Sequence, residues 1–121
     1  MMQEHLEASS GSDQFVTAVA DTYAIWMETS DFSSGCPIAT TMLECAPHSP
    51  EIRAAGLVAI DRWITIVADA FKKNGNDSLD AASKGEAFIA GIQGALILSR
   101  IRKNVGPLDK LAESFRNHGI G

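Results

Sequence analysis

The feature of this sequence that most limits its fold is a nearly unbroken apolar run from Ala87 to Leu98, in which Gln93 is the polar exception. Polar residues border the run, and the pattern predicts a helix from about Asp80 to Lys103. The apolar run would be about 18 Å long as a helix, against about 30 Å of bilayer hydrocarbon, so it predicts a buried helix and no membrane span. A helix that is apolar on every side must be covered on every side, and a second subunit is the economical cover in so short a chain.

The rest of the chain also follows helical spacing, and strict apolar/polar alternation almost never persists as a strand would require. Most of the four Pro and ten Gly fall between the periodic segments. Ser49 followed by Pro50 has the chemistry of a helix start, with a capping side chain and a proline at the first helical position. The sequence therefore predicts an all-α fold of about five helices in a single domain. The expected helices cover about 12–29, 37–46, 50–73, 80–103 and a last segment that starts at Gly106-Pro107.

These helices place one domain over residues 12–119 and leave residues 1–11 as an N-terminal tail. The chain has 121 residues, which suits one domain and leaves no room for a second of ordinary size. The N-terminal residues lack a basic stretch followed by an apolar one, so they do not form a secretory signal. A cytoplasmic location is the resulting expectation.

The charge balance argues against DNA binding by this chain alone. Ten Lys and Arg stand against fifteen Asp and Glu, a formal charge of −5. That sign is wrong for a surface that must neutralise many phosphates. The two cysteines and the absence of repeated Cys/His spacing also argue against a disulfide scaffold or a zinc module.

No arrangement of residues predicts catalysis, a metal site or a cofactor. The sequence has no G-x-S-x-G element, and His5, His48 and His118 lack partners at ligand spacing. Cys36 directly precedes Pro37 at an expected helix start, where a helix dipole favours a thiolate. A reactive thiol is one interpretation of Cys36, and a small residue packed at a turn is the more ordinary one. We expect a protein that is not an enzyme.

A set of aromatic and flexible side chains falls on segments that could converge around a flat apolar ligand. Aromatic residues at helical spacing more often form a core, so the core interpretation stays open beside the ligand interpretation. Gln93 is the most informative residue, because an amide among apolar neighbours needs a partner, which a ligand, the backbone or a second subunit could supply. The candidate ligand-binding residues are Tyr23, Trp26, Met42, Trp63, Phe88 and Gln93, with Tyr23 as a possible hydrogen-bond donor.

Small residues recur every fourth position within the long apolar run, from Ala87 through Gly91 and Ala95 to Ser99. Such a smooth strip allows another helix to approach closely. The last expected helix adds a narrow apolar face of its own. Two adjacent helices with these faces predict a homodimer, and the candidate interface residues are Gly91, Ala95, Leu98, Leu111 and Phe115.

Several segments together resemble the C-terminal regulatory domain of TetR-type transcriptional regulators, in the group of LmrA/YxaF-like repressors. The resemblance covers roughly residues 13–118. It implies an all-helical domain whose last two helices pair with their mates in a second subunit, while the other helices enclose an effector pocket. The segments that carry it are Phe32-Ser33-Ser34-Gly35-Cys36-Pro37-Ile38-Ala39, Leu43-Glu44, Ser49-Pro50-Glu51-Ile52-Arg53, Trp63, Gly94-Ala95-Leu96-Ile97-Leu98-Ser99-Arg100 and Pro107-Leu108.

The resemblance implies that an N-terminal helix-turn-helix domain binds the operator in such proteins, and we expect this chain to lack that domain, because only about a dozen residues precede the first expected helix. The leading hypothesis is an effector-sensing and dimerisation domain that binds a small apolar or aromatic molecule and controls operator binding by the missing domain. The alternative is a DNA-free partner that modulates an intact relative by heterodimerisation. The expected partners are a small-molecule effector and a second copy of the chain, with no direct contact to DNA or membrane. A small helical enzyme is the weakest hypothesis, since no acid/base pair or nucleophile supports it.

Overall fold

A computed structural model describes residues 1–33 and 44–116 of the chain, and every regular element in these ranges is an α-helix. The all-α prediction is therefore confirmed. None of the helices in the described ranges is both long and apolar enough to cross a membrane. The helices are α1 (Met2–Ala8), α2 (Ser12–Thr29), α4 (Pro50–Lys73), α5 (Ser78–Arg102) and α6 (Gly106–Phe115).

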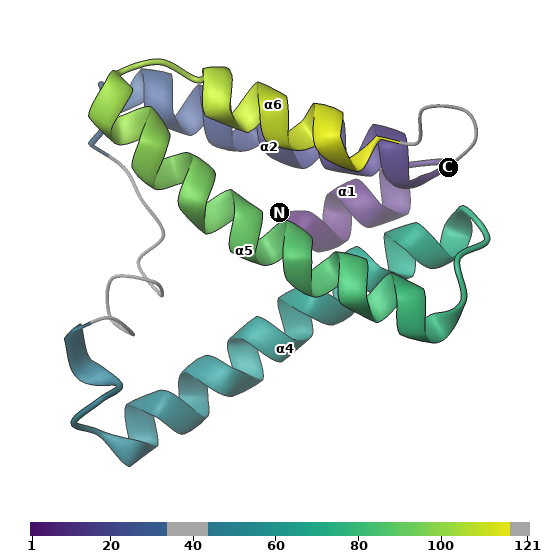
Figure 1. The fold of residues 1–121 in the computed structure, drawn as a ribbon, viewed down its shortest axis with the longest axis horizontal. Helices are drawn as coiled ribbons and strands as arrows, with labels where there is room; N and C mark the ends of the chain where they lie inside the picture. Colours follow the sequence, from purple (N-terminus) through teal and green to yellow (C-terminus); the bar gives the residue numbers. More distant parts are fainter. Residues whose placement is uncertain (34–43, 117–121) are drawn as a thin grey trace.

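The two longest helices, α4 and α5, make the most extensive helix pair of the fold. They cross at an angle, so the first half of α4 projects away from the other helices (Figure 1). The helix α6 turns back from the end of α5 and lies beside α2, while the short α1 packs against α2 and α4. The molecule is thus a helical bundle with one protruding arm, the N-terminal half of α4.

Side chains at the N-cap position cap two of the five helices in the described ranges, α4 and α5. The Ser49 side chain accepts a hydrogen bond from the Ile52 amide at 3.2 Å, and the Asp77 carboxylate accepts one from the Asp80 amide at 2.8 Å. The helix α5 consequently begins at Ser78, two residues before the predicted start. At α2, no side chain of its own N-terminus forms the cap.

The core lies where α2, α4, α5 and α6 meet, and its members come from the apolar face of each helix. Phe15, Phe88 and Leu108 are fully buried. Because buried apolar area contributes about 25 cal/mol per Å², these large side chains dominate the stabilisation of the bundle. The other fully or almost fully buried hydrophobic residues include Val16, Val19, Ala20, Met27, Val67, Ala70, Ala81, Ile92 and Ala112.

The closest approach between α4 and α5 occurs at Gly85. A Cβ atom on Gly85 would lie 2.8 Å from the Ile64 carbonyl oxygen and 3.2 Å from the Ala68 nitrogen. Both are backbone atoms, so a side chain at this position would force the helices apart. The crossing of α4 over α5 therefore depends on a glycine that periodicity alone did not single out.

The first eleven residues differ from the predicted tail, because Met2–Ala8 forms α1. Met2 and Leu6, one helical turn apart, are 6% and 7% exposed and join the hydrophobic core. A helix of seven residues is too short to be stable alone in water. Its spacing of two apolar residues is a weak sequence signal, and the packing against α2 and α4 is what stabilises it.

Candidate functional site

Two of the candidate ligand-binding residues lie one turn apart on α2 and contact each other. The Tyr23 and Trp26 rings meet edge to face, with centroids 5.3 Å apart and planes at 77°. Tyr23 is only 8% exposed, whereas Trp26 is 47% exposed. This arrangement leaves a large aromatic surface accessible at the C-terminal half of α2, next to the exposed side chain of Ile25.

Trp63 and Gln93 are both half-buried, on α4 and α5 respectively. Trp63 packs against the hydrophobic core together with its neighbours Ile60 and Ile64. Half-burial leaves part of the indole and of the amide within reach of a bound molecule. Met42, Cys36 and most of the predicted helix over 37–46 lie outside the described residues.

Phe88 is fully buried, unlike the other described candidate ligand-binding residues. Its ring meets that of Phe115 edge to face at a centroid distance of 5.2 Å. Phe115 was expected at a subunit interface and Phe88 at a ligand site, so the structure joins a residue from each candidate set within one core. Phe88 is placed to support the fold and has no surface open to a ligand in this conformation.

The predicted interface residues on the smooth strip are already covered by their own chain. Gly91 lies beneath α6, because a Cβ atom on Gly91 would come within 2.5 Å of Leu111 Cδ1. Ala95 is 5% exposed, and the next member of the strip, Ser99, is fully buried. The apolar face of α6 likewise points inward, with Leu111 and Phe115 packed against the core.

A different face of α5 is apolar and uncovered. Ile97, Leu98 and Ile101 are 56%, 42% and 73% exposed. At about 100° per residue they share one face of the helix with exposed small residues of the preceding turns. A Cβ atom on Gly94, in the middle of this face, would meet nothing within 4 Å. We call this surface the α5 stripe; it comprises Ala87, Ala90, Gly94, Ile97, Leu98 and Ile101.

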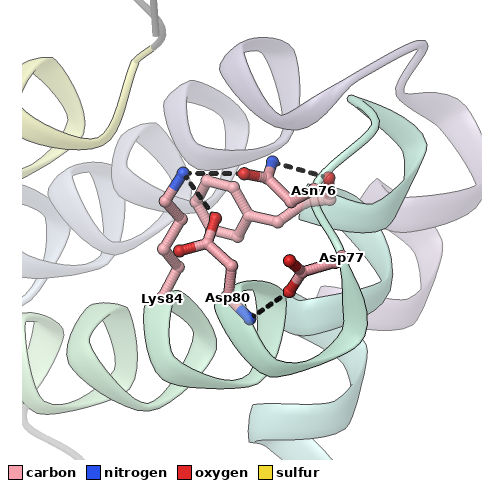
Figure 2. A network of polar contacts seen from close by, with 5 residues as sticks. Asn76, Asp77, Asp80 and Lys84 are labelled. Atoms are coloured by element: carbon pink, nitrogen blue, oxygen red, sulfur yellow. Dashed lines mark hydrogen bonds and ion pairs between the residues drawn. The ribbon is translucent and has the colours of Figure 1, made fainter.

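The turn between α4 and α5 is held by a compact polar network (Figure 2). Lys84 Nζ donates to Asn76 Oδ1 at 2.8 Å and lies 3.2 Å from Asp80 Oδ2. Asn76 Nδ2 in turn donates to the Phe71 carbonyl oxygen at 2.9 Å. The Lys84 ammonium also lies 5.6 Å from the centroid of the Phe71 ring, within the range of a cation–π contact. These contacts fix the end of α4 against the start of α5.

The sequence patterns did not indicate the contact made by Arg100, whose guanidinium donates a hydrogen bond to the Ser33 carbonyl oxygen. This bond ties α5 to the turn that follows α2. Asp31 and Phe32 in that turn have positive φ angles of 53° and 60°, a backbone region that residues other than glycine rarely adopt. Since the bonded residues are 67 positions apart, no local pattern could have revealed the contact.

The described residues contain no group of three or more His, Cys, Asp or Glu side chains placed to hold a metal ion. Cys45, a half-buried residue that precedes α4, is a free thiol. The described candidate ligand-binding residues carry aromatic and amide groups, and such groups can bind ligands by burial, ring contacts and hydrogen bonds.

The described residues form an all-helical domain with an exposed indole on α2 and an uncovered apolar face on α5. The comparison with known families identifies this domain: residues 6–114 match the C-terminal domain of LmrA/YxaF-like transcriptional regulators, and the chain belongs to this TetR-type family. The resemblance inferred from the sequence motifs is thereby confirmed.

Two curated relatives are uncharacterized HTH-type transcriptional regulators of Mycobacterium tuberculosis, from strains CDC 1551 and H37Rv. Each is 28% identical to this chain over 123 aligned residues, which cover 94% of this chain and 63% of the relative. The chain thus spans less than two thirds of the length of these relatives. No solved structure gave a significant match.

Proposed function

We propose that this domain senses a small, flat, largely apolar molecule and passes the signal through a homodimer to the DNA-reading part of a transcriptional regulator. Membership of a regulator family supports the role in transcription. The observation that carries the ligand proposal is Trp26, an indole that stays 47% exposed while it packs on the buried Tyr23 ring. A flat ligand that covers this indole would gain apolar burial and ring contacts.

The proposed ligand contacts are Tyr23, Trp26, Trp63 and Gln93, together with Met42, which lies outside the described residues. The two indoles would supply apolar area, and the half-buried Gln93 amide would supply orientation through a hydrogen bond. Phe88 has a different role in this proposal, because it is fully buried and packs on Phe115.

The ligand proposal can be tested with Nile red, a neutral, flat and apolar dye. We expect quenching of tryptophan fluorescence on titration, and roughly tenfold weaker binding for Trp26→Phe or Trp63→Phe, about 1.4 kcal/mol. Leu79→Ala is the matched control, since Leu79 is 86% exposed on the first turn of α5. The cationic dye rhodamine 6G tests whether charge is also recognised. Saturable binding of neither dye would reject a site for flat apolar molecules.

For the homodimer we propose the α5 stripe as the contact surface. Its small residues, Ala87 and Ala90, lie on the N-terminal side of Gly94, and its bulky residues lie on the C-terminal side. A two-fold axis near Gly94 would set the small half of one helix against the bulky half of its mate. Such a surface is self-complementary, as a closed dimer requires. Leu98 belongs to this surface, while Gly91 and Ala95 support it from within the chain.

Sedimentation velocity tests the dimer. We expect a dimeric wild-type chain and a folded monomer for Leu98→Glu, because a charge in the centre of an apolar contact is costly to bury. Ala82→Glu is the matched control, since Ala82 is exposed on α5 outside the α5 stripe. A monomeric wild type at high micromolar concentration would refute the dimer. Equal dimerisation of the two variants would place the interface elsewhere.

A further inference from the structure

The side chain of the last residue of α4 forms hydrogen bonds at the C-terminal end of α1. Lys73 Nζ donates hydrogen bonds to the carbonyl oxygens of Leu6 at 2.5 Å and Ser9 at 3.2 Å. The last carbonyls of a helix have no partners within the helix and carry its partial negative charge. An ammonium group from another helix therefore supplies both the missing donors and a favourable charge.

The next residue, Asn74, holds the start of α2. Its Oδ1 atom accepts a hydrogen bond from the Ser12 amide at 3.0 Å. The N-cap position of α2 is Gly11, which has no side chain to form this cap. A Cβ atom on Gly11 would overlap Asn74 Oδ1 at 2.4 Å, so the missing side chain is what admits the cap from α4. Lys73 and Asn74 thus form hydrogen bonds on both sides of the α1–α2 turn.

The same end of α4 is fixed to the helices on its other side. The network of Asn76 and Lys84 ties it to α5 (Figure 2), and the Phe71 ring lies 6.2 Å from that of Phe115 on α6. Lys73 and Asn74 therefore join the α1–α2 turn to this end of α4 by hydrogen bonds, beside the apolar packing of α1 and α2 against α4. Met2 and Leu6 of α1 join the hydrophobic core, and His5 Nε2 lies within hydrogen-bond distance, 2.9 Å, of Thr22 Oγ1 on α2.

We propose that Lys73 and Asn74 are positioning residues that set the direction of α1 relative to the α4–α5 hairpin. A shift of the hairpin would then be carried into α1. The regulatory meaning rests on the proposed function: this chain matches a C-terminal domain, so α1 is its described element nearest to the part of the regulator that precedes it. A seven-residue helix is too short to be stable alone, so its contacts determine its orientation, and the Lys73 bonds are polar contacts that join it to α4.

Electron–electron resonance distances between spin labels test this role. In a Cys36→Ser/Cys45→Ser background, one label pair joins α1 to α5 (Glu4→Cys with Ala82→Cys). A control pair joins α2 to α5 (Asp21→Cys with Ala82→Cys). All three labelled positions are exposed. Mixing labelled chains with excess unlabelled chains restricts the signal to distances within one chain, whether or not the chain dimerises.

Lys73→Met keeps the aliphatic stem and removes the three donors. We expect the α1–α5 distance distribution to widen at least twofold while the α2–α5 distribution keeps its wild-type width. Lys73→Arg retains donors and is expected to restore a narrow α1–α5 distribution. Lys72→Met is the matched control, because the Lys72 ammonium lies 3.9 Å from Asp69 of its own helix and forms no bond to α1 in the described ranges. Asn74→Ala is expected to widen the same α1–α5 distribution.

An unchanged α1–α5 distribution in both Lys73→Met and Asn74→Ala would overturn the proposal. So would equal widening of both label pairs, which would indicate general loosening of the bundle. A further measurement adds saturating Nile red, which we expect to shift the α1–α5 distance in wild type and to leave it unshifted in Lys73→Met. A dye that binds without shifting the wild-type distance would contradict coupling. A dye that does not bind would count against the proposed ligand site, while the variant distances still decide the role of Lys73 and Asn74.

Discussion

Gly91 of α5 lies directly beneath Leu111 of α6, since a Cβ atom on Gly91 would stand 2.5 Å from Leu111 Cδ1. Gly91, one of the small residues that recur along α5, therefore serves the packing of the last two helices within one chain. The surface that we propose for a second subunit is the uncovered α5 stripe.

Gly91→Leu is expected to destabilise the folded chain by about 1–3 kcal/mol, because the added side chain occupies the volume filled by Leu111. Urea unfolding followed by circular dichroism, at a fixed chain concentration, measures the change. Ala82→Leu is the control, since Ala82 is exposed on α5 outside the α5 stripe. Equal midpoints for wild type and Gly91→Leu would show that α6 does not pack on Gly91.

Gly85→Ala should destabilise the crossing of α4 and α5 although it adds a single methyl group. The new Cβ atom would approach the Ile64 carbonyl oxygen and the Ala68 nitrogen, and backbone atoms cannot move aside as a flexible side chain can. We expect a loss of about 1–3 kcal/mol by thermal or urea unfolding. At an open helical position the same substitution typically gains up to about 1 kcal/mol. A stabilised Gly85→Ala variant would contradict the close crossing.

Phe88→Ala is expected to cost about 3–5 kcal/mol of stability, because it removes a fully buried ring that contacts Phe115. Phe88→Leu retains most of the apolar volume and should fold. If Nile red binds wild type, we expect its dissociation constant for Phe88→Leu to stay within about twofold of the wild-type value, about 0.4 kcal/mol. Loss of dye binding in folded Phe88→Leu would instead make Phe88 a direct ligand contact.

The caps of α4 and α5 offer an independent stability test. Ser49→Ala removes the acceptor of the Ile52 amide, and Asp77→Ala removes that of the Asp80 amide. Each substitution should cost about 1 kcal/mol. Ser78→Ala serves as the control, since Ser78 is exposed and begins α5 without capping it. Chemical unfolding of the three variants gives the comparison, and equal midpoints would argue against both caps.

The helical class, the family and most helix boundaries follow from patterns along the chain. Helical spacing of apolar residues persists over α2, α4, α5 and α6, and cap and stop residues mark the helix ends. The start of α4 at Pro50 and its end at Lys73 agree with the prediction. These features are local, so a few neighbouring residues suffice to specify them.

Which apolar face meets which neighbour depends on how the helices pack. Periodicity shows that α5 is apolar on all sides between Ala87 and Leu98, but it does not show that Gly91 meets Leu111 while Ile97 and Ile101 stay uncovered. The same holds for α1, because its contacts with other helices stabilise it, and for the bonds from Lys73 to Leu6 and Ser9. The two Lys73 bonds join residues more than sixty positions apart, and their geometry follows from how the helices pack.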